Sequence, residues 1–481
     1  MKNGIKEKAF KAAKWTSITT IVSQIIVFFF SIIKFRLLEV EVFGIMAIVN
    51  SIITILRMTQ TMGFAPALVQ KETIDNVIVN SVFWLIICIS IFFSSCLILL
   101  SDWISSFYNQ EILKILLTIA GAQFVFSSFT IVQKTLLLRD LEFKVIRLIE
   151  LASMIGSSLI IIYLALNNYG IWSLVFGSIA NTLFTFVFYI KYTKWFPSFR
   201  FSWNALKSLA KYGFNITLLK VVDILKLSLP ELIIGKILGT EMLGLYTFAK
   251  GIILKILRQA DAMIVEVLFP LFSRLQNEMT ILVKGYLKVN HYTFILTIPI
   301  LMGYVFIAED FVKVLYGQKW LAAVTISQIL LIFSLINSVY SKGTSIITAV
   351  GRPDISIKIE LFMFLPLLIA LLIAVRFSII HFVITLVIIK SIEFIIQQMV
   401  LRNIVKLNFF DFLRCLKTPI MATIVMITFL FVLQSMLSQT IDPIVSLITI
   451  ILSCGIIYFL TLFYFDRKEL VPTIRSLIRS K

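Results

Sequence analysis

Ionisable side chains lie inside several long apolar segments of this sequence, where a charge is costly unless it faces a protein interior or a water-filled cavity. Most of them fall in two consecutive segments, 211–235 and 242–268, and one arginine falls in segment 42–63. The basic candidates for binding a substrate are Arg57, Lys220, Lys226, Lys255 and Arg258. The acidic candidates for binding a coupling ion are Asp223, Asp261 and Glu266.

The spacing of these charges predicts one polar side on each helix. At 100° per residue, the charges of segment 242–268 fall within an arc of about 160°, and those of segment 211–235 within about 140°. Bases exceed acids in the set, so we predict a basic, water-filled cavity that suits an anionic group such as a phosphate or a uronic acid. The alternative is that the charges form internal salt bridges that stabilise helix packing, as Lys255 or Arg258 could with Asp261. Pro230 lacks an amide hydrogen and favours a bend in segment 211–235, which would serve either gating or packing.

Apolar runs long enough to cross a bilayer recur along almost the whole chain, whose 481 residues are 59% hydrophobic and 14% charged. A bilayer core requires roughly 20 apolar residues per helix. Barrel strands would be about ten residues long and alternating, so these continuous runs are helices. We therefore predict an all-α polytopic membrane protein with fourteen transmembrane helices. They are expected at 15–36, 42–63, 77–100, 112–133, 145–167, 171–191, 211–235, 242–268, 289–308, 320–341, 359–376, 379–401, 415–437 and 443–465.

Lysine and arginine concentrate at the N-terminus, in every second loop and in the tail, although the loop after segment 42–63 holds only Lys71. One such loop follows segment 320–341 and is expected to hold Lys342, Arg352 and Lys358. The intervening loops, such as 167–170, are short and poor in bases. Basic loops stay in the cytoplasm, so this alternation predicts that both termini are cytoplasmic. The same bias explains the formal net charge of +19 without a nucleic-acid partner.

Two halves of the sequence resemble each other. Glu41-Val42-Phe43-Gly44-Ile45 matches Glu241-Met242-Leu243-Gly244-Leu245, and two further matches, 102–110 with 310–318 and 139–144 with 352–358, follow in the same order. This repeat predicts a six-helix bundle at 1–200 and another at 201–405, with a site near the midplane between them. The remaining part, 406–481, is expected to form two extra transmembrane helices and a cytoplasmic tail.

Searches for catalytic and cofactor-binding patterns are negative. The sequence has no Walker-type glycine-lysine loop, no Gly-x-Ser-x-Gly elbow and no His-Glu-x-x-His. Its four cysteines are scattered and its two histidines, His291 and His381, lie far apart. We expect no catalytic residues, no metal site and no cofactor, and we do not expect an enzyme.

Several motifs resemble those of bacterial polysaccharide transporters. They include Leu137-Leu138-Arg139-Asp140-Leu141-Glu142-Phe143-Lys144, Gly170-Ile171-Trp172-Ser173, Gly244-Leu245-Tyr246, Gly317-Gln318-Lys319-Trp320 and Val350-Gly351-Arg352. The resemblance spans about residues 10 to 360. It is closest to the branch of colanic-acid and teichuronic-acid exporters within the multidrug/oligosaccharidyl-lipid/polysaccharide exporter superfamily. The chain departs from that branch at Lys34-Phe35-Arg36 and at Glu39-Val40-Glu41, which could alter the outer mouth.

This resemblance implies fourteen helices in two lobes, alternating access and a location in the bacterial inner or plasma membrane. The implied cargo is a lipid-linked oligosaccharide, usually on undecaprenyl pyrophosphate. It would be flipped from the inner to the outer leaflet for export of a cell-surface polysaccharide such as lipopolysaccharide O-antigen, exopolysaccharide or capsule. The expected partners are this cargo and membrane lipid, with polysaccharide polymerase machinery as a further candidate.

Two other functions compete with the flippase. A small-molecule or drug antiporter of the same superfamily is the main alternative, but a carrier of cationic drugs should have an acidic cavity. A membrane glycosyltransferase or ligase would need a large outward loop, whereas no outward loop here exceeds about twelve residues by the predicted topology.

Overall fold

The computed structural model describes residues 19, 22–61, 63–71, 74–254, 279–437 and 442–467, apart from the side chains of 205, 208–221 and 223. Within these residues the chain is helical and contains no strand. The chain divides into two compact units, 1–247 and 248–481. The three-part division predicted from the sequence, with boundaries after residues 200 and 405, stays a prediction.

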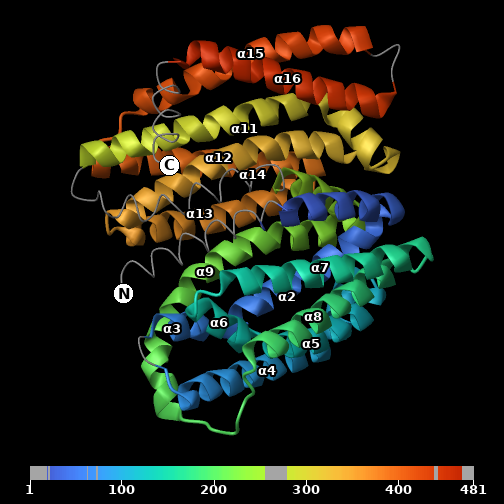
Figure 1. Cartoon of the computed structure of the whole chain (residues 1–481), viewed down its shortest axis with the longest axis vertical. Coiled ribbons are helices and arrows are strands. Elements are labelled where there is room, and N and C mark those ends of the chain that lie inside the picture. Colours follow the sequence, from blue (N-terminus) through green and yellow to red (C-terminus); the bar gives the residue numbers. More distant parts are fainter. Residues whose placement is uncertain are drawn as a thin grey trace. The chain divides into compact units, whose positions relative to one another are not determined.

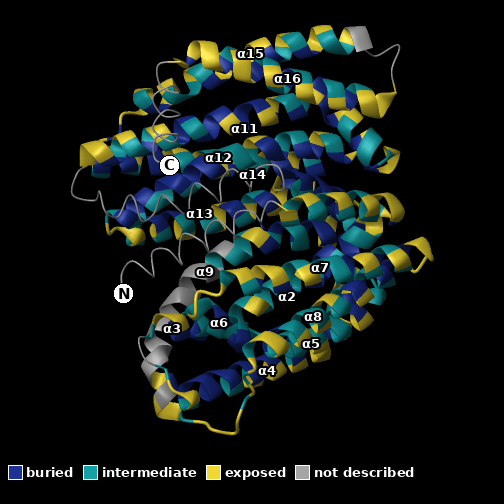
Figure 2. Cartoon of the chain, viewed as in Figure 1, coloured by how far each residue is buried: buried dark blue, intermediate teal, exposed yellow. Residues whose placement is uncertain are grey.

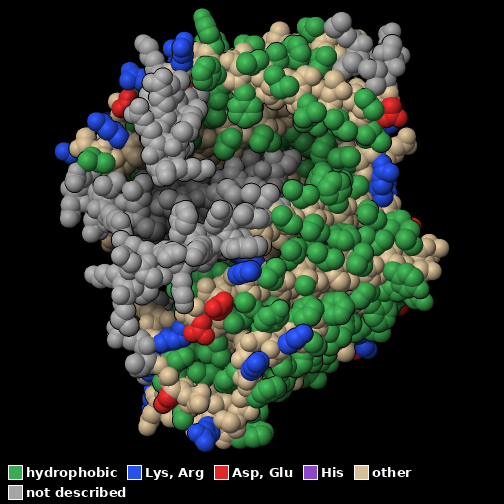
Figure 3. Space-filling model, in the orientation of Figure 1, with side chains coloured by type: hydrophobic (Ala, Val, Ile, Leu, Met, Phe, Trp, Pro, Cys, Tyr) green, Lys and Arg blue, Asp and Glu red, His purple; other side chains and the backbone are tan. Residues whose placement is uncertain are grey.

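The first unit begins with helical residues 22–37 and contains eight further helices that the structure delimits. These are α2 (Val40–Thr61), α3 (Phe64–Gln70), α4 (Asn76–Tyr108), α5 (Ile112–Ser128), α6 (Ile131–Arg139), α7 (Phe143–Leu166), α8 (Ile171–Thr193) and α9 (Trp203–Ile237) (Figure 1). Residues 239–254 are also helical. Figure 3 shows hydrophobic side chains covering a continuous face over α7 and α8. Such a face suits contact with lipid.

The second unit contains six long helices within its described residues. These are α11 (Met279–Leu315), α12 (Ala323–Ala349), α13 (Pro353–Ala374), α14 (Ile379–Val405), α15 (Phe409–Leu437) and α16 (Pro443–Phe465). The pair α15 and α16 packs on α11, and α12 packs on α14 (Figure 1). Figure 2 shows few exposed residues on α12, whereas α15 and α16 carry many.

Eleven helices among the described residues are long and apolar enough to cross a membrane. They are α2, α4, α5 with α6, α7, α8 and α11 to α16, and each overlaps one predicted segment. The predicted segment 211–235 corresponds to α9, which is too polar to join them. Segments 15–36 and 242–268 lie partly outside the described residues. The all-helical, multi-pass membrane class is thus confirmed, and the count of fourteen stays a prediction.

Several helices extend beyond the apolar runs that predict them. Helix α9 begins at Trp203, inside the stretch expected to be a loop. Helix α12 continues to Ala349, so Lys342 lies within a helix and is fully buried. The prediction that Lys342 belongs to a cytoplasmic loop is therefore wrong. Its ammonium group donates to the carbonyl oxygen of Ser338 at 3.1 Å and to the Ser338 hydroxyl at 2.7 Å, and these hydrogen bonds offset part of the cost of burying it.

The two copies of the first repeated motif, around Gly44 and Gly244, pack against each other inside the first unit. A Cβ atom at Gly44 would lie 1.7 Å from the carbonyl oxygen of Thr240, and one at Gly244 would lie 2.1 Å from the carbonyl oxygen of Val40. The Thr240 hydroxyl also donates to the Glu41 carboxylate at 2.8 Å. The two glycines therefore occupy equivalent positions in a close helix crossing, where small residues let backbones approach.

A buried histidine joins three helices of the second unit. The Nε2 atom of His291, on α11, lies 2.9 Å from a carboxylate oxygen of Asp466, which follows α16. Its Nδ1 atom lies 2.9 Å from the carbonyl oxygen of Cys415 on α15. This contact fixes the C-terminal helix pair against α11.

Candidate functional site

The structure gives detailed surroundings for one of the residues that the sequence singles out. Arg57 is an exposed residue of α2 and lines a cavity. Lys226 is half-buried on α9. Lys220 and Asp223 also lie on α9, but their side chains are outside the described part of the structure. The other candidates, which are Lys255, Arg258, Asp261 and Glu266, lie outside the described residues. The predicted basic set therefore stays a prediction.

Arg57 belongs to a face of α2 that lines two adjoining cavities. Met46, Asn50, Ile53 and Arg57 follow one another at steps of four, three and four residues, so they share one side of the helix. The larger cavity, here the main cavity, has a volume of about 450 Å³. The smaller one, the side cavity, has a volume of about 80 Å³ and is lined by Arg57. Both cavities share Met46, Asn50 and Ser178 as lining residues and belong to the first unit.

Two asparagines bring polar groups to the main cavity at the depth of the bilayer core. Asn50 lies near the middle of α2 and Asn181 near the middle of α8, and both are exposed. An amide that faced lipid would lose its hydrogen bonds at a cost of several kcal/mol. Both residues instead line the main cavity, and neither side-chain amide has a hydrogen-bond partner among the described residues. These amides are therefore available to water or to a ligand.

The remaining polar lining of the main cavity is held by hydrogen bonds. The hydroxyl of buried Ser51, on α2, donates to the carboxylate of Glu231 on α9. The side-chain nitrogen of Gln123 donates to the carbonyl oxygen of Ser178 at 2.8 Å, and the Ser178 hydroxyl donates back to Gln123 Oε1 at 3.2 Å. Helices α2, α5, α8 and α9 thus each fix a polar group at or beside the cavity.

An aromatic pair lines the same cavity. The rings of Phe35 and Phe43 have centroids 4.4 Å apart at an interplanar angle of 34°. No lysine or arginine lines the main cavity among the described residues, and Glu231 is its one carboxylate there. This lining combines amide, hydroxyl, carboxylate and aromatic groups, so it differs from the basic cavity that the sequence predicts.

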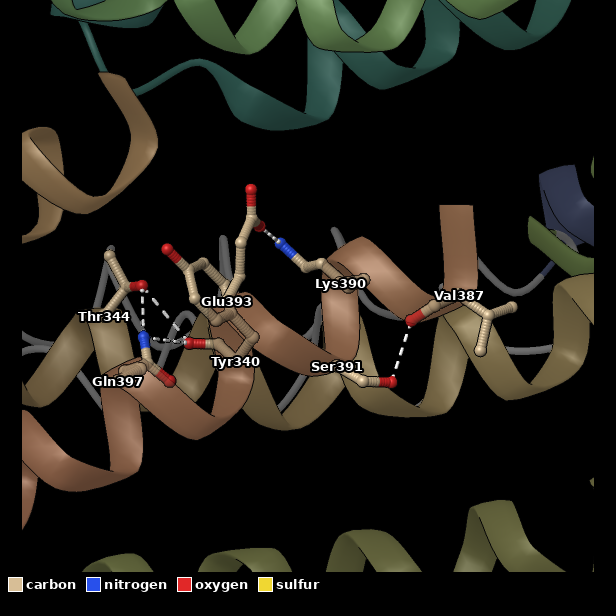
Figure 4. Close-up of polar contacts among 7 residues, drawn as sticks. All are labelled: Tyr340, Thr344, Val387, Lys390, Ser391, Glu393 and Gln397. Carbon is tan, nitrogen blue, oxygen red and sulfur yellow. Dashed lines mark hydrogen bonds and ion pairs between the residues drawn. The ribbon is translucent and has the colours of Figure 1, made fainter. Parts of the chain in front are cut away.

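The second unit holds a buried ion pair on α14 (Figure 4). Lys390 Nζ lies 2.9 Å from Glu393 Oε2, and the two side chains are only 11% and 3% exposed. The Lys390 ammonium also lies 3.7 Å from the centre of the Tyr340 ring on α12. One turn further on, Gln397 donates to the carbonyl oxygen of Tyr340 at 3.0 Å and to the Thr344 hydroxyl at 2.9 Å. These contacts join α12 to α14 at a charged position inside the membrane-spanning region.

Asn50, Asn181 and the main cavity are absent from the sequence-based predictions because neither asparagine carries a charge. The signal that could have identified each asparagine is a single uncharged amide at the centre of an apolar run. The predicted segment 379–401 contains Lys390 and Glu393, but neither is among the candidate site residues.

Comparison with known proteins places the chain among membrane proteins of polysaccharide synthesis. Residues 35–325 match the profile of a family described as polysaccharide biosynthesis protein. The chain belongs to this family. It is a multi-pass membrane protein of the bacterial polysaccharide transporter group, as its sequence motifs predict.

Curated relatives of this polysaccharide biosynthesis protein match over most of its length. It is 25% identical over 436 residues to the teichuronic acid biosynthesis protein TuaB of Bacillus subtilis (strain 168), with 88% of each chain covered. It is 24% identical over 378 residues to the lipopolysaccharide biosynthesis protein WzxC of Escherichia coli (strain K12), with 75% of each chain covered. These relatives are named for the biosynthesis of teichuronic acid and of lipopolysaccharide.

Solved structures identify the fold of this family member. The lipid II flippase MurJ in an inward closed conformation matches with a TM-score of 0.75 and 14% identity, covering 95% of this chain and 99% of that chain. An inward-facing multidrug resistance MATE family transporter of the MOP superfamily matches with a TM-score of 0.61 and 14% identity, covering 81% and 99%. At this identity the similarity establishes a MurJ- and MATE-like fold, and no shared substrate.

Proposed function

We propose that this protein flips a lipid-linked oligosaccharide, of the undecaprenyl-pyrophosphate type, from the inner to the outer leaflet of the bacterial cell membrane. The flipped unit serves the export of a cell-surface polysaccharide such as O-antigen, exopolysaccharide or capsule. The observation that carries the proposal is the polar lining of the main cavity at mid-span, with Asn50 and Asn181 exposed there. A hydrophilic glycan needs such groups to replace water as it passes the bilayer core.

The names of the curated relatives support a polysaccharide as the cargo. Teichuronic acid and lipopolysaccharide are both cell-surface glycans, and the chain matches the proteins named for them over most of its length. In this proposal both termini are cytoplasmic, transport proceeds by alternating access, and polysaccharide polymerase machinery receives the flipped unit.

The proposal assigns the pyrophosphate to the basic residues predicted from the sequence. These are Arg57, Lys220, Lys226, Lys255 and Arg258. Arg57 is the member whose position supports this role best, because its exposed guanidinium lies on a membrane-spanning helix and lines the side cavity. Guanidinium groups bind phosphate oxygens through paired, charge-assisted hydrogen bonds. Asp223, Asp261 and Glu266 are the proposed acids for coupling to a proton or sodium ion.

A deletion strain tests this function. We expect the complete lipid-linked oligosaccharide to accumulate in the inner leaflet, and a plasmid copy of the wild-type gene to restore surface polysaccharide. An Arg57→Ala copy should restore at most about a tenth of it at normal protein levels, since loss of a bidentate contact costs about 1.4 kcal/mol or more.

Lys114→Ala is the matched control, because Lys114 is an exposed base of the same unit whose ion pair with Asp102 lies at the surface. It should restore export fully. Accumulation of an incomplete lipid-linked unit would instead indicate a transferase. Normal surface polysaccharide in the deletion strain, together with increased drug sensitivity, would indicate a drug antiporter.

A further inference from the structure

The groups that line the main cavity suit the sugar residues of the proposed cargo better than its pyrophosphate. Its volume of about 450 Å³ lies within the range of roughly 300–1,000 Å³ that is usual for small-molecule sites. The cavity lies beside the centres of α2 and α8, since Asn50 and Asn181 mark the middle of those helices. A ligand of saccharide size therefore fits at mid-membrane depth.

The hydrogen-bonding groups of the cavity suit a polyhydroxylated ligand. Each asparagine amide offers two donors and one acceptor oxygen, so it can pair with a sugar hydroxyl in either sense. The Glu231 carboxylate is acceptor-only and is already oriented by the Ser51 hydroxyl. The lining also includes Ser157 and Thr247, which add hydroxyl groups. A sugar ring presents hydroxyls in several directions, which matches this mixed set.

The aromatic pair of the cavity suits the apolar face of a sugar ring. Phe35 comes from helical residues 22–37 and Phe43 from α2, and their rings lie 4.4 Å apart. Binding sites typically combine such apolar surface with a few placed polar groups. The rings can therefore cover the C–H face of a sugar while the amides bind its hydroxyls.

The charge of the main cavity disfavours pyrophosphate. Its described lining carries one carboxylate, Glu231, and no basic side chain. Phosphate oxygens bind best to cationic donors, and this lining offers them none. The nearest described base on the same face is Arg57, seven residues beyond Asn50, and it lines the side cavity instead. Among the described residues, the lining of the main cavity thus differs from that of the side cavity, which holds Arg57.

We propose that the main cavity is a glycan subsite that binds uncharged sugar residues of the cargo through the amides of Asn50 and Asn181. This inference rests on the proposed function, because it identifies which part of the lipid-linked oligosaccharide the first unit recognises. It assigns selectivity for the glycan to the main cavity, and affinity for the lipid pyrophosphate to the basic residues.

Direct binding tests the subsite apart from transport. The oligosaccharide that accumulates in the deletion strain is released from its lipid by mild acid and titrated into the purified full-length protein by calorimetry. Inorganic pyrophosphate is titrated separately as the second probe. Asn50→Ala and Asn181→Ala should each weaken binding of the oligosaccharide about tenfold. Asn181→Ala should also leave binding of pyrophosphate unchanged, because Asn181 lines the main cavity and not the side cavity that holds Arg57. Asn50→Ser, which keeps a short hydrogen-bonding group, should recover part of the loss.

Asn204→Ala is the matched control, because Asn204 is an exposed amide at the start of α9 and is not among the residues lining either cavity. It should bind both probes like the wild type. The inference is overturned if both asparagine variants bind the oligosaccharide normally, if Asn181→Ala weakens binding of both probes alike, or if the wild type binds only pyrophosphate. Failure of the proposed function looks different: the wild type binds the free oligosaccharide but moves no lipid-linked oligosaccharide across vesicles.

Discussion

Replacing Gly44 by alanine should destabilise the protein, because the helix crossing at this position leaves no room for a side chain. The new Cβ atom would lie 1.7 Å from the carbonyl oxygen of Thr240. An ordinary contact begins near 3.4 Å, so the two backbones must separate locally by about 1.7 Å. Overpacking typically costs about 1–3 kcal/mol. We expect a value at the upper end here, because the obstacle is a backbone atom that cannot rotate away.

Thermal denaturation in detergent, followed by fluorescence-detected gel filtration, measures this effect. Gly244→Ala should behave like Gly44→Ala, since its Cβ would lie 2.1 Å from the carbonyl oxygen of Val40. The matched control is Gly251→Ala, where the Cβ would have nothing within 4 Å. That variant should melt at or above the wild-type Tm, because alanine favours a helix by about 1 kcal/mol over glycine. If Gly44→Ala and Gly251→Ala melt together, the close crossing is refuted.

Three further predictions concern the second unit and the topology. Glu393→Gln should lower the free energy of unfolding by about 3–5 kcal/mol, since it leaves the Lys390 charge without its carboxylate. A double variant in which Leu and Met replace both members of the pair should recover most of this stability. Losses that simply add in a double-mutant cycle would argue against a coupled pair. Asp466→Asn should weaken the contact with His291 and speed hydrogen exchange in α16, whereas unchanged protection would show that this contact does not hold the helix. In a variant lacking the native cysteines, a cysteine at Asn168 should react with an impermeant thiol reagent on intact cells; reaction only after permeabilisation would invert the topology.

The helical membrane architecture was predictable because its signals are local. Apolar length identifies a span from neighbouring residues alone, and α16 begins and ends where the sequence places it, at Pro443 and Phe465. The ends of helices were harder to predict from the sequence wherever polar residues continue a helix. Lys342 marks the end of an apolar run, yet α12 continues through it because Ser338, one turn earlier, provides hydrogen bonds for the ammonium group. That compensation depends on a contact that hydropathy does not register.

The candidate site was only partly predictable. Arg57 carries a charge in an apolar run, so the sequence identified it, and the structure places it at a cavity. Asn50 and Asn181 carry no charge and lie 131 positions apart, so only the packing of α2 against the other helices of the first unit brings them to one cavity. The carboxylate of Glu231 joins them for the same reason. Tertiary contacts of this kind leave no pattern in a single sequence.

Flipping by the purified protein tests the central claim most directly. The full-length protein is reconstituted into vesicles that carry the lipid-linked oligosaccharide from the deletion strain in one leaflet, and an impermeant sugar-oxidising reagent reports its arrival in the other. We expect transfer at a rate well above that of protein-free vesicles, and a loss of about tenfold or more with Arg57→Ala but none with Lys114→Ala. Transfer no faster than in protein-free vesicles, in the presence of each ion gradient in turn, would contradict the account.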